Sequence, residues 1–143
     1  MQDCKRNRYG SECGLYRNLF ENAPISLWSM DLSRVKSFLN ELEQGGVRNI
    51  RACLAADPSL IKECLSRVVV NDVNLQTLIL FEAQSKNQVI GRFADIAGRE
   101  ESELSNIESI AAIAENKSNY QAYSVHWTLN ARKVDILYNW WVL

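Results

Sequence analysis

Apolar residues recur along this chain with two spacings, and each spacing predicts a different kind of element. A repeat of three and four residues predicts amphipathic helices. Pro24 and the pair Gly45-Gly46 are suited to stop two of these helices. Asn49, Asp57 and Asn74 are suited to cap the starts of three others. The helices are expected over residues 11–22, 32–44, 49–56, 57–68, 74–83, 85–91 and about 100–115.

Alternation of apolar and polar residues predicts four strands, over residues 25–31, 67–73, 120–129 and 132–142. The last two strands flank Asn130-Ala131, which is expected to form a two-residue hairpin turn. The expected core-facing residues of this hairpin are Tyr123, Val125, Trp127 and Leu129, then Val134, Ile136, Tyr138, Trp140 and Val142. Strands at both ends with helices between them predict an α+β domain, in which helices cover one face of an antiparallel sheet.

Composition places the chain among globular domains, with 47% hydrophobic and 23% charged residues. A formal net charge of −1 gives no electrostatic reason to expect nucleic acid or an anionic membrane as a partner. No apolar run approaches the roughly 20 residues that a membrane helix needs. The polar N-terminal segment lacks the apolar stretch of a signal peptide. We therefore predict a cytoplasmic location without membrane insertion.

The residues that could carry chemistry form no catalytic or metal-binding motif. Cys4, Cys13, Cys53 and Cys64 include no CxxC pair, and the single histidine, His126, cannot complete a Cys/His zinc site of usual spacing. Cys53 and Cys64 fall at apolar helix positions, which favours a role as small buried hydrophobic residues. His126 alternates with the apolar set and is expected on the polar face of its strand. The sequence thus predicts no enzyme.

Several segments together resemble the PAS sensory domain. They are "ENAPISLW", "VNDVNLQTLILF", "DPSLIKECLSRV" and the closing hairpin "YSVHWTLNARKVDILYNWWVL". The chain is most similar to a bacterial subgroup that has a helical insertion between the first two strands and stands N-terminal in sensor histidine kinases and diguanylate cyclases. The resemblance implies a leader over residues 1–18, with a flexible start and a flanking amphipathic helix. A PAS-like domain over residues 19–143 would follow it.

The strand count departs from the PAS pattern. PAS domains have five strands in the spatial order 2-1-5-4-3, whereas this chain supplies four and lacks the central fifth strand. Three arrangements are open: strands one and four pair directly, another chain supplies a strand, or the leader fills the position. The hairpin turn also has Asn130-Ala131 where the family usually has a glycine.

The resemblance implies a small pocket between the inner face of the sheet and the short helices. Its candidate lining residues are Trp28, Met30, Phe81, Val89, Tyr123, Val125, Tyr138 and Trp140. The alternative is that these side chains simply fill the core. No flavin, haem or metal signature accompanies them, so the identity of any small-molecule ligand is left open.

The second implied feature is an interface. The helix over residues 11–22 and the end of the last strand offer apolar side chains that suit a homodimer. The candidates are Leu15, Leu19, Leu137, Trp141 and Leu143. The implied function is a sensory module that relays the binding of a ligand or partner to an effector domain or signalling partner. A ligand-free dimerisation module and a small enzyme or carrier with an apolar pocket are the alternatives.

Overall fold

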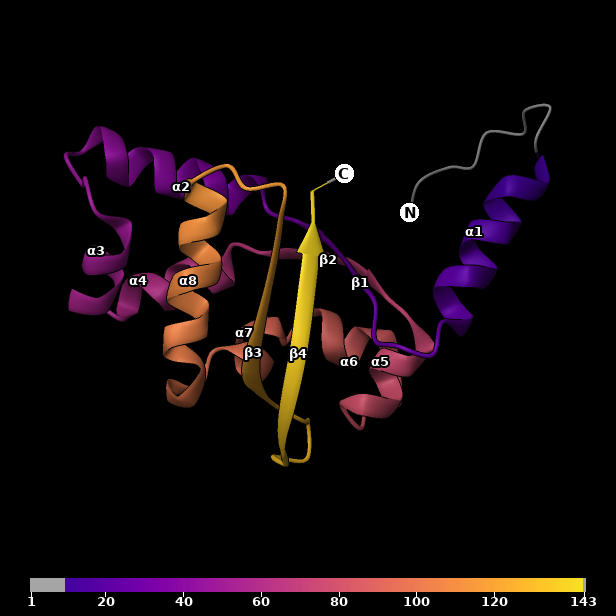
Figure 1. Ribbon diagram of the computed structural model, residues 1–143. Coiled ribbons are helices and arrows are strands. Elements are labelled where there is room, and N and C mark those ends of the chain that lie inside the picture. Colours follow the sequence, from indigo (N-terminus) through magenta and orange to yellow (C-terminus); the bar gives the residue numbers. More distant parts are fainter. Residues whose placement is uncertain (1–9, 143) are drawn as a thin grey trace.

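The computed structural model describes residues 10–142, with side chains from Gly14 onward. Of the flexible start expected at residues 1–10, all but Gly10 lies outside the described residues, as does the interface candidate Leu143. Figure 1 labels the elements along the chain. In chain order they are α1 (Gly10–Asn22), β1 (Trp28–Asp31), α2 (Ser33–Gln44), α3 (Ile50–Ala56), α4 (Ser59–Ser66), β2 (Val69–Val73), α5 (Leu75–Leu80), α6 (Lys86–Ile90), α7 (Phe93–Ala97), the 3₁₀ turn η1 (Glu100–Ser102), α8 (Glu103–Ala114), β3 (Asn119–Trp127) and β4 (Lys133–Trp141).

The helices and strands form the predicted α+β class, but the strands make two separate antiparallel pairs. β1 pairs with β2, from Trp28 opposite Val73 to Asp31 opposite Val69, with an irregularity after Ser29. β3 pairs with β4 in a longer hairpin. The described residues therefore show two two-stranded sheets, where the sequence predicted one sheet of four strands.

Helix α8 lies between the hairpin and the helices α2–α4, and α1 extends away from the rest of the chain (Figure 1). Two hydrophobic clusters fill the interior. The first joins α2, α3, α4 and α8 through Val35, Leu39, Leu54, Ile61, Cys64, Leu65, Ile107 and Ile110. The second joins β2, α5, α6 and α7 through Val70, Val73, Phe81, Val89 and Ile96. Leu104 of α8 takes no part in either cluster and is 80% exposed.

The predicted caps form because their side chains accept the free N–H groups at helix starts. The side chain of Asn49 accepts a hydrogen bond from the backbone N–H of Ala52 at 3.0 Å. Asp57 accepts one from the backbone N–H of Ser59 at 3.2 Å. Asn74 caps α5 by accepting from the N–H of Thr77 at 3.1 Å.

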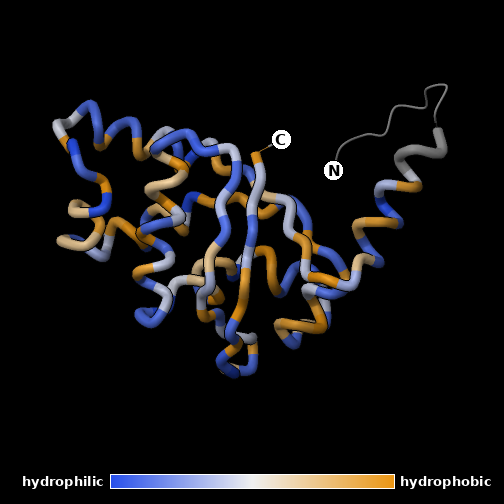
Figure 2. The backbone as a smooth tube through the Cα atoms, in the orientation of Figure 1, coloured by the Kyte–Doolittle hydropathy of each residue, from blue (hydrophilic) through white to orange (hydrophobic). Residues whose placement is uncertain are grey.

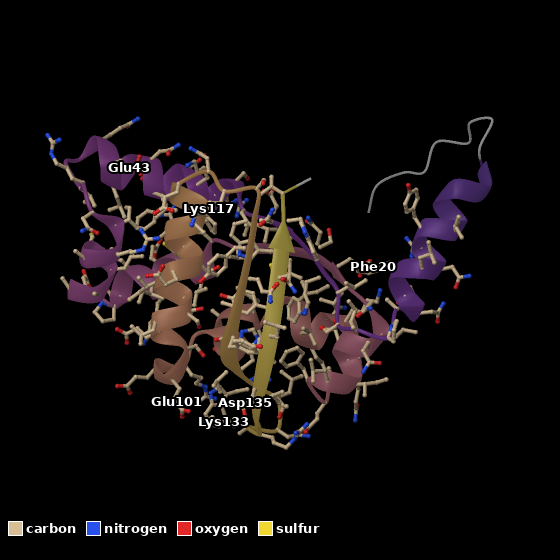
Figure 3. The ribbon with its side chains drawn as sticks, viewed as in Figure 1. Phe20, Glu43, Glu101, Lys117, Lys133 and Asp135 are labelled. Carbon is tan, nitrogen blue, oxygen red and sulfur yellow. The ribbon has the colours of Figure 1, made fainter. Side chains whose placement is uncertain are left out.

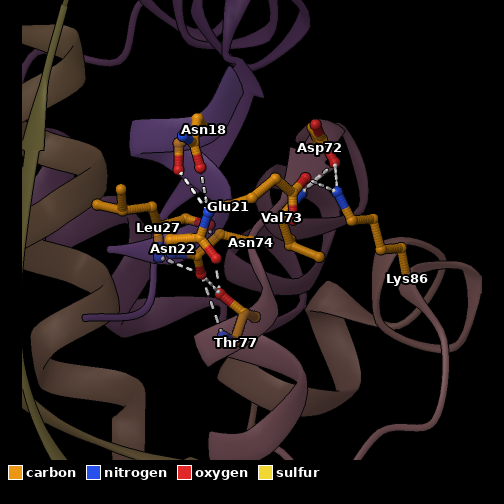
Figure 4. Close-up of polar contacts among 9 residues, drawn as sticks. All are labelled: Asn18, Glu21, Asn22, Leu27, Asp72, Val73, Asn74, Thr77 and Lys86. Atoms are coloured by element: carbon orange, nitrogen blue, oxygen red, sulfur yellow. Dashed lines mark hydrogen bonds and ion pairs between the residues drawn. The ribbon is translucent and has the colours of Figure 1, made fainter. Parts of the chain in front are cut away.

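Asn74 also fastens the segment before β1 to the start of α5 (Figure 4). Its Oδ1 accepts from the N–H of Leu27 at 3.0 Å, and its Nδ2 donates to the carbonyl oxygen of Ile25 at 2.8 Å. The Thr77 hydroxyl donates to the same Oδ1 at 2.9 Å. Asn74 and Thr77 are both completely buried, so these bonds satisfy groups that water does not reach.

The hairpin turn is longer by one residue than predicted. The N–H of Thr128 donates to the carbonyl oxygen of Arg132 at 2.8 Å, which leaves Leu129, Asn130 and Ala131 as a three-residue loop. Ala131 takes the left-handed conformation, with φ of 62°. A residue of this conformation commonly closes a three-residue hairpin loop.

The extra loop residue reverses the faces of β3. A shift of one residue in register moves every side chain of a strand to the opposite face. Tyr123 pairs with Leu137, and His126 pairs with Val134. The even-numbered residues of β3 therefore share the inner face with Val134, Ile136, Tyr138 and Trp140, while Tyr123, Val125 and Trp127 lie on the outer face. The predicted faces are wrong for β3 and right for β4.

Candidate functional site

The predicted pocket residues nearest β1 are packed against one another. The Trp28 ring lies edge-on to the rings of Phe81 and Phe93, with centroids 5.7 Å apart in each pair. Phe81 and Val89 are 2% and 0% exposed. Met30 packs against the same cluster. This part of the predicted pocket is filled by its own side chains.

The other four predicted pocket residues do not join that cluster. Tyr138 and Trp140 lie on the inner face of the hairpin, whereas Tyr123 and Val125 lie on the outer face. Tyr123 is 79% exposed. The structure thus divides the predicted set between a packed core, the inner hairpin face and the outer hairpin face.

A row of serines on η1 and α8 holds the hairpin, and the sequence prediction missed it. The Ser102 hydroxyl donates to the carbonyl oxygen of Val125, and the Ser105 and Ser124 hydroxyls lie 2.6 Å apart. The indole N–H of Trp140 donates to the Ser109 hydroxyl at 3.1 Å. Serines three and four residues apart share one face of a helix, which was the available sequence signal. The Ser102 bond reaches the edge of β3 that faces away from β4, whereas the other two contacts lie on the inner face of the hairpin.

His126 lies on the inner face of β3, between the rings of Phe81 and Tyr138. Its Nδ1 is buried and has no hydrogen-bond partner among the described residues. Burial lowers the pKa of His126 to about 4, so the ring is uncharged at neutral pH. This placement corrects the expectation that His126 lies on a polar face, because the register reversed that face.

A surface hollow of about 540 Å³ lies where α8 meets the hairpin. Leu104, Tyr123 and Leu137 contribute apolar side chains, and Glu101, Ser105 and Asp135 contribute polar ones. At the lower end of the hairpin, the Lys133 ammonium lies 2.7 Å from a carboxylate oxygen of Glu101 (Figure 3). The hollow is open to solvent, so its shape suits a contact surface better than an enclosed small-molecule site.

The acidic and sulfur-containing side chains described from Gly14 to Val142 show no arrangement for metal chemistry. No three His, Cys, Asp or Glu side chains in this part of the chain come together closely enough to hold a metal ion. Cys64 is buried, and this burial raises the pKa of its thiol to about 11. A thiol of such high pKa is a poor nucleophile at neutral pH, because the thiolate is the reactive form.

Large apolar side chains are exposed on α1, on the segment that follows it and on α5. On α1, Leu15 is 57% exposed, Tyr16 73% and Leu19 59%. Ile25 and Ile79 are 61% and 69% exposed. Hydrophobic and hydrophilic positions alternate along α1 in Figure 2. An isolated helix of this length is only marginally stable in water, so it needs a covering surface.

Lys86 ties α1 to the rest of the chain. Its ammonium is paired with the carboxylate of Glu21 on α1 and lies 2.9 Å from a carboxylate oxygen of Asp72 on β2. It also lies 5.9 Å from the centroid of the Phe20 ring. Burial disfavours the charge, but the hydrogen bonds to Glu21 and Asp72 outweigh it and raise the pKa of Lys86. Only a small part of α1 is thus fastened.

The predicted interface residues lie at two places. Leu15 and Leu19 are on α1, whereas Leu137 and Trp141, 48% and 65% exposed, are on the outer face of β4. The structure does not bring these two groups together. Leu143 is outside the described residues.

Comparison of the chain with known protein families, with curated proteins and with solved structures finds no match. Among the described residues, no helix has the length and apolar character needed to span a bilayer.

Proposed function

We propose that this chain is a non-catalytic regulatory module of a bacterial, cytoplasmic signal-transduction protein. In this proposal it forms a homodimer and passes a change in packing to an effector domain or signalling partner. The observation that carries the proposal is the set of large apolar side chains left exposed on α1 and on the outer face of β4. Exposed apolar surfaces of this kind usually mark contacts with other proteins.

The order of elements supports a PAS-like origin of this module. A flanking helix, a first strand, a helical insertion, a second strand, short helices, a long helix and a closing hairpin follow one another in that order. We propose that β1, β2, β3 and β4 correspond to the first four strands of a PAS-like sheet.

The relay would use two packings of α1 against the rest of the chain. Lys86 links α1 to β2 through its two carboxylate partners, and α1 also contacts α5. A partner that covers Leu15 and Leu19 would favour one packing over the other, because a ligand shifts an equilibrium by its difference in affinity for the two states.

Light scattering on the intact chain tests the homodimer directly. We expect the mean mass to rise from that of one chain toward that of two across the micromolar range. A mass of one chain at every concentration would contradict the proposed dimeric module.

A ligand-sensing role is the second candidate, and the His126 ring favours it. A buried ring nitrogen without a partner is uncommon in folded proteins, since leaving such a group unsatisfied costs about 1–3 kcal/mol. A small molecule with a hydrogen-bonding group could satisfy it. Native and denaturing mass spectrometry of the purified chain and of His126→Phe test this candidate. A bound molecule that is lost on denaturation of the original chain, and that is absent from His126→Phe, supports it. A native mass equal to that of the polypeptide alone, in the original chain as well as the variant, contradicts it.

A further inference from the structure

The free edge of β4 carries unpaired backbone groups. In an antiparallel pair, alternate residues direct their N–H and C=O groups toward the neighbouring strand, and the residues between them direct these groups away. The bond from the Thr128 N–H to the Arg132 oxygen and the bond from the Val142 N–H to the Ser118 oxygen fix which residues face β3. The register between them assigns the outward groups to Lys133, Asp135, Leu137, Asn139 and Trp141.

These outward groups have no backbone partner in the described chain. β1 and β4 belong to different sheets, and the leader residues from Gly10 to Asn22 form helix α1 and not a strand. Of the three arrangements open from the sequence, direct pairing of β1 with β4 is therefore not found in residues 10–142. A long strand whose edge groups are unpaired is a template for pairing with another strand.

We infer that β4 pairs antiparallel with β4 of a second copy of this chain, about a two-fold axis at Leu137. This register places Leu137 opposite the same residue of the copy, Asp135 opposite Asn139, and Lys133 opposite Trp141. No like charges face each other across the strands. Leu137 is the midpoint of the nine-residue strand, so this register pairs β4 along its whole length. A register centred on Asp135 or on Lys133 would pair fewer residues and would place like charges directly opposite each other, which is unfavourable.

Contacts on the outer edge of β3 oppose the addition of further chains there. The Ser102 hydroxyl of η1 donates to the Val125 carbonyl oxygen, and the N–H of Leu129, in the loop after β3, donates to the carbonyl oxygen of Phe81. A hairpin with one free edge forms a closed pair, whereas one with two free edges could add strands without limit. The inference deepens the proposed homodimer and rests on it, since it assigns the contact to β4 and leaves α1 for a different partner.

Two substitutions at one exposed position test this register. Asn139→Asp places a carboxylate opposite Asp135 of the second copy, and Asn139→Lys places an ammonium there; each contact occurs twice in the dimer. We expect the dimer dissociation constant, measured by sedimentation equilibrium, to rise about threefold to thirtyfold for Asn139→Asp and to fall by a similar factor for Asn139→Lys.

Matched controls separate this contact from others. Gln121 is the exposed partner of Asn139 on β3, so Gln121→Asp and Gln121→Lys make the same charge changes one strand away from the edge. They should alter the dissociation constant less than about twofold, because screening weakens the more distant charges. Urea unfolding of all four variants verifies that they fold.

The possible results have distinct meanings. Opposite effects at Asn139 with small effects at Gln121 support pairing along β4. A dimer that is indifferent to both Asn139 variants, or that is lost in Leu19→Glu, overturns the inference and leaves the homodimer of the proposed function standing. A chain that is monomeric throughout overturns both.

Discussion

The uncharged His126 ring makes the stability of this protein depend on pH. Burial sets the pKa of the folded state at about 4, whereas the ordinary value is 6.5. Between pH 6.5 and pH 4 the His126 ring is protonated in the unfolded chain but stays neutral in the folded chain. The free energy of unfolding therefore decreases as the pH falls toward 4. Below pH 4 both states are protonated and this contribution no longer changes.

We expect His126 to lower the free energy of unfolding by up to about 3 kcal/mol between pH 7 and pH 4. His126→Phe keeps an aromatic ring between Phe81 and Tyr138 but removes the titrating group. The difference in unfolding free energy between the original chain and this variant should therefore change with pH over that window. Urea unfolding at several pH values measures it, and a constant difference would contradict the buried, neutral ring.

Ala131 is the second residue whose local geometry has a measurable consequence. Its φ of 62° lies in the left-handed region, which costs a non-glycine residue roughly 1–2 kcal/mol. Ala131→Gly should raise the free energy of unfolding by about 0.5–1 kcal/mol, after the greater chain entropy of glycine is counted.

The same substitution within a helix provides the control for Ala131. Ala55 is exposed on α3, where alanine is the favoured residue. Ala55→Gly should lower the free energy of unfolding by about 0.5–1 kcal/mol. Denaturant unfolding measures the free energy of unfolding of both variants. If Ala131→Gly and Ala55→Gly change it in the same direction, Ala131 does not have the left-handed conformation.

At the scale of elements, the start of α5 depends on one buried side chain. Asn74 satisfies the backbone of Leu27 and Ile25 as well as Thr77, so it holds two segments together. Asn74→Ala should lower the free energy of unfolding by about 3 kcal/mol, because several buried groups lose their partners. Asn49→Ala, at an exposed cap of α3, should cost only about 1 kcal/mol. Equal losses in urea unfolding would refute the buried network.

Sequence patterns predicted the elements better than their faces. The caps at Asn49, Asp57 and Asn74 depend on residues within a few positions, so local reasoning found them. The face of β3 depends on the loop length, and one additional residue at Ala131 reversed it. This error placed Tyr123 in the expected pocket and left His126 out of it.

The serine row and the separate sheets were beyond local reasoning for a related reason. Ser102, Ser105 and Ser109 gain their role only when the hairpin packs across η1 and α8. Serines on a helix otherwise indicate a solvated face. Whether two strand pairs join into one sheet likewise depends on tertiary contacts between segments that are far apart in the sequence. The pattern within one segment does not predict such contacts.

The whole molecule is a packed body with two exposed apolar surfaces, one on α1 and one on the outer face of β4. Of the aromatic residues predicted to line a pocket, Trp28 and Phe81 fill the core, whereas Tyr123 lies exposed on the outer face of the hairpin. The two surfaces lie on different elements, so one can join copies of the chain while the other meets a partner. We propose that the free edge of β4 forms the contact between copies.

Amide hydrogen exchange along β4, followed by NMR at low and high protein concentration, detects this pairing residue by residue. The N–H groups of Ile136 and Tyr138 face β3 and serve as internal controls whose protection stays constant. The N–H groups of Leu137 and Asn139 face outward, so we predict that they exchange rapidly in dilute solution and become protected as concentration rises. Rapid exchange of Leu137 and Asn139 at every concentration would contradict the pairing of two copies along β4.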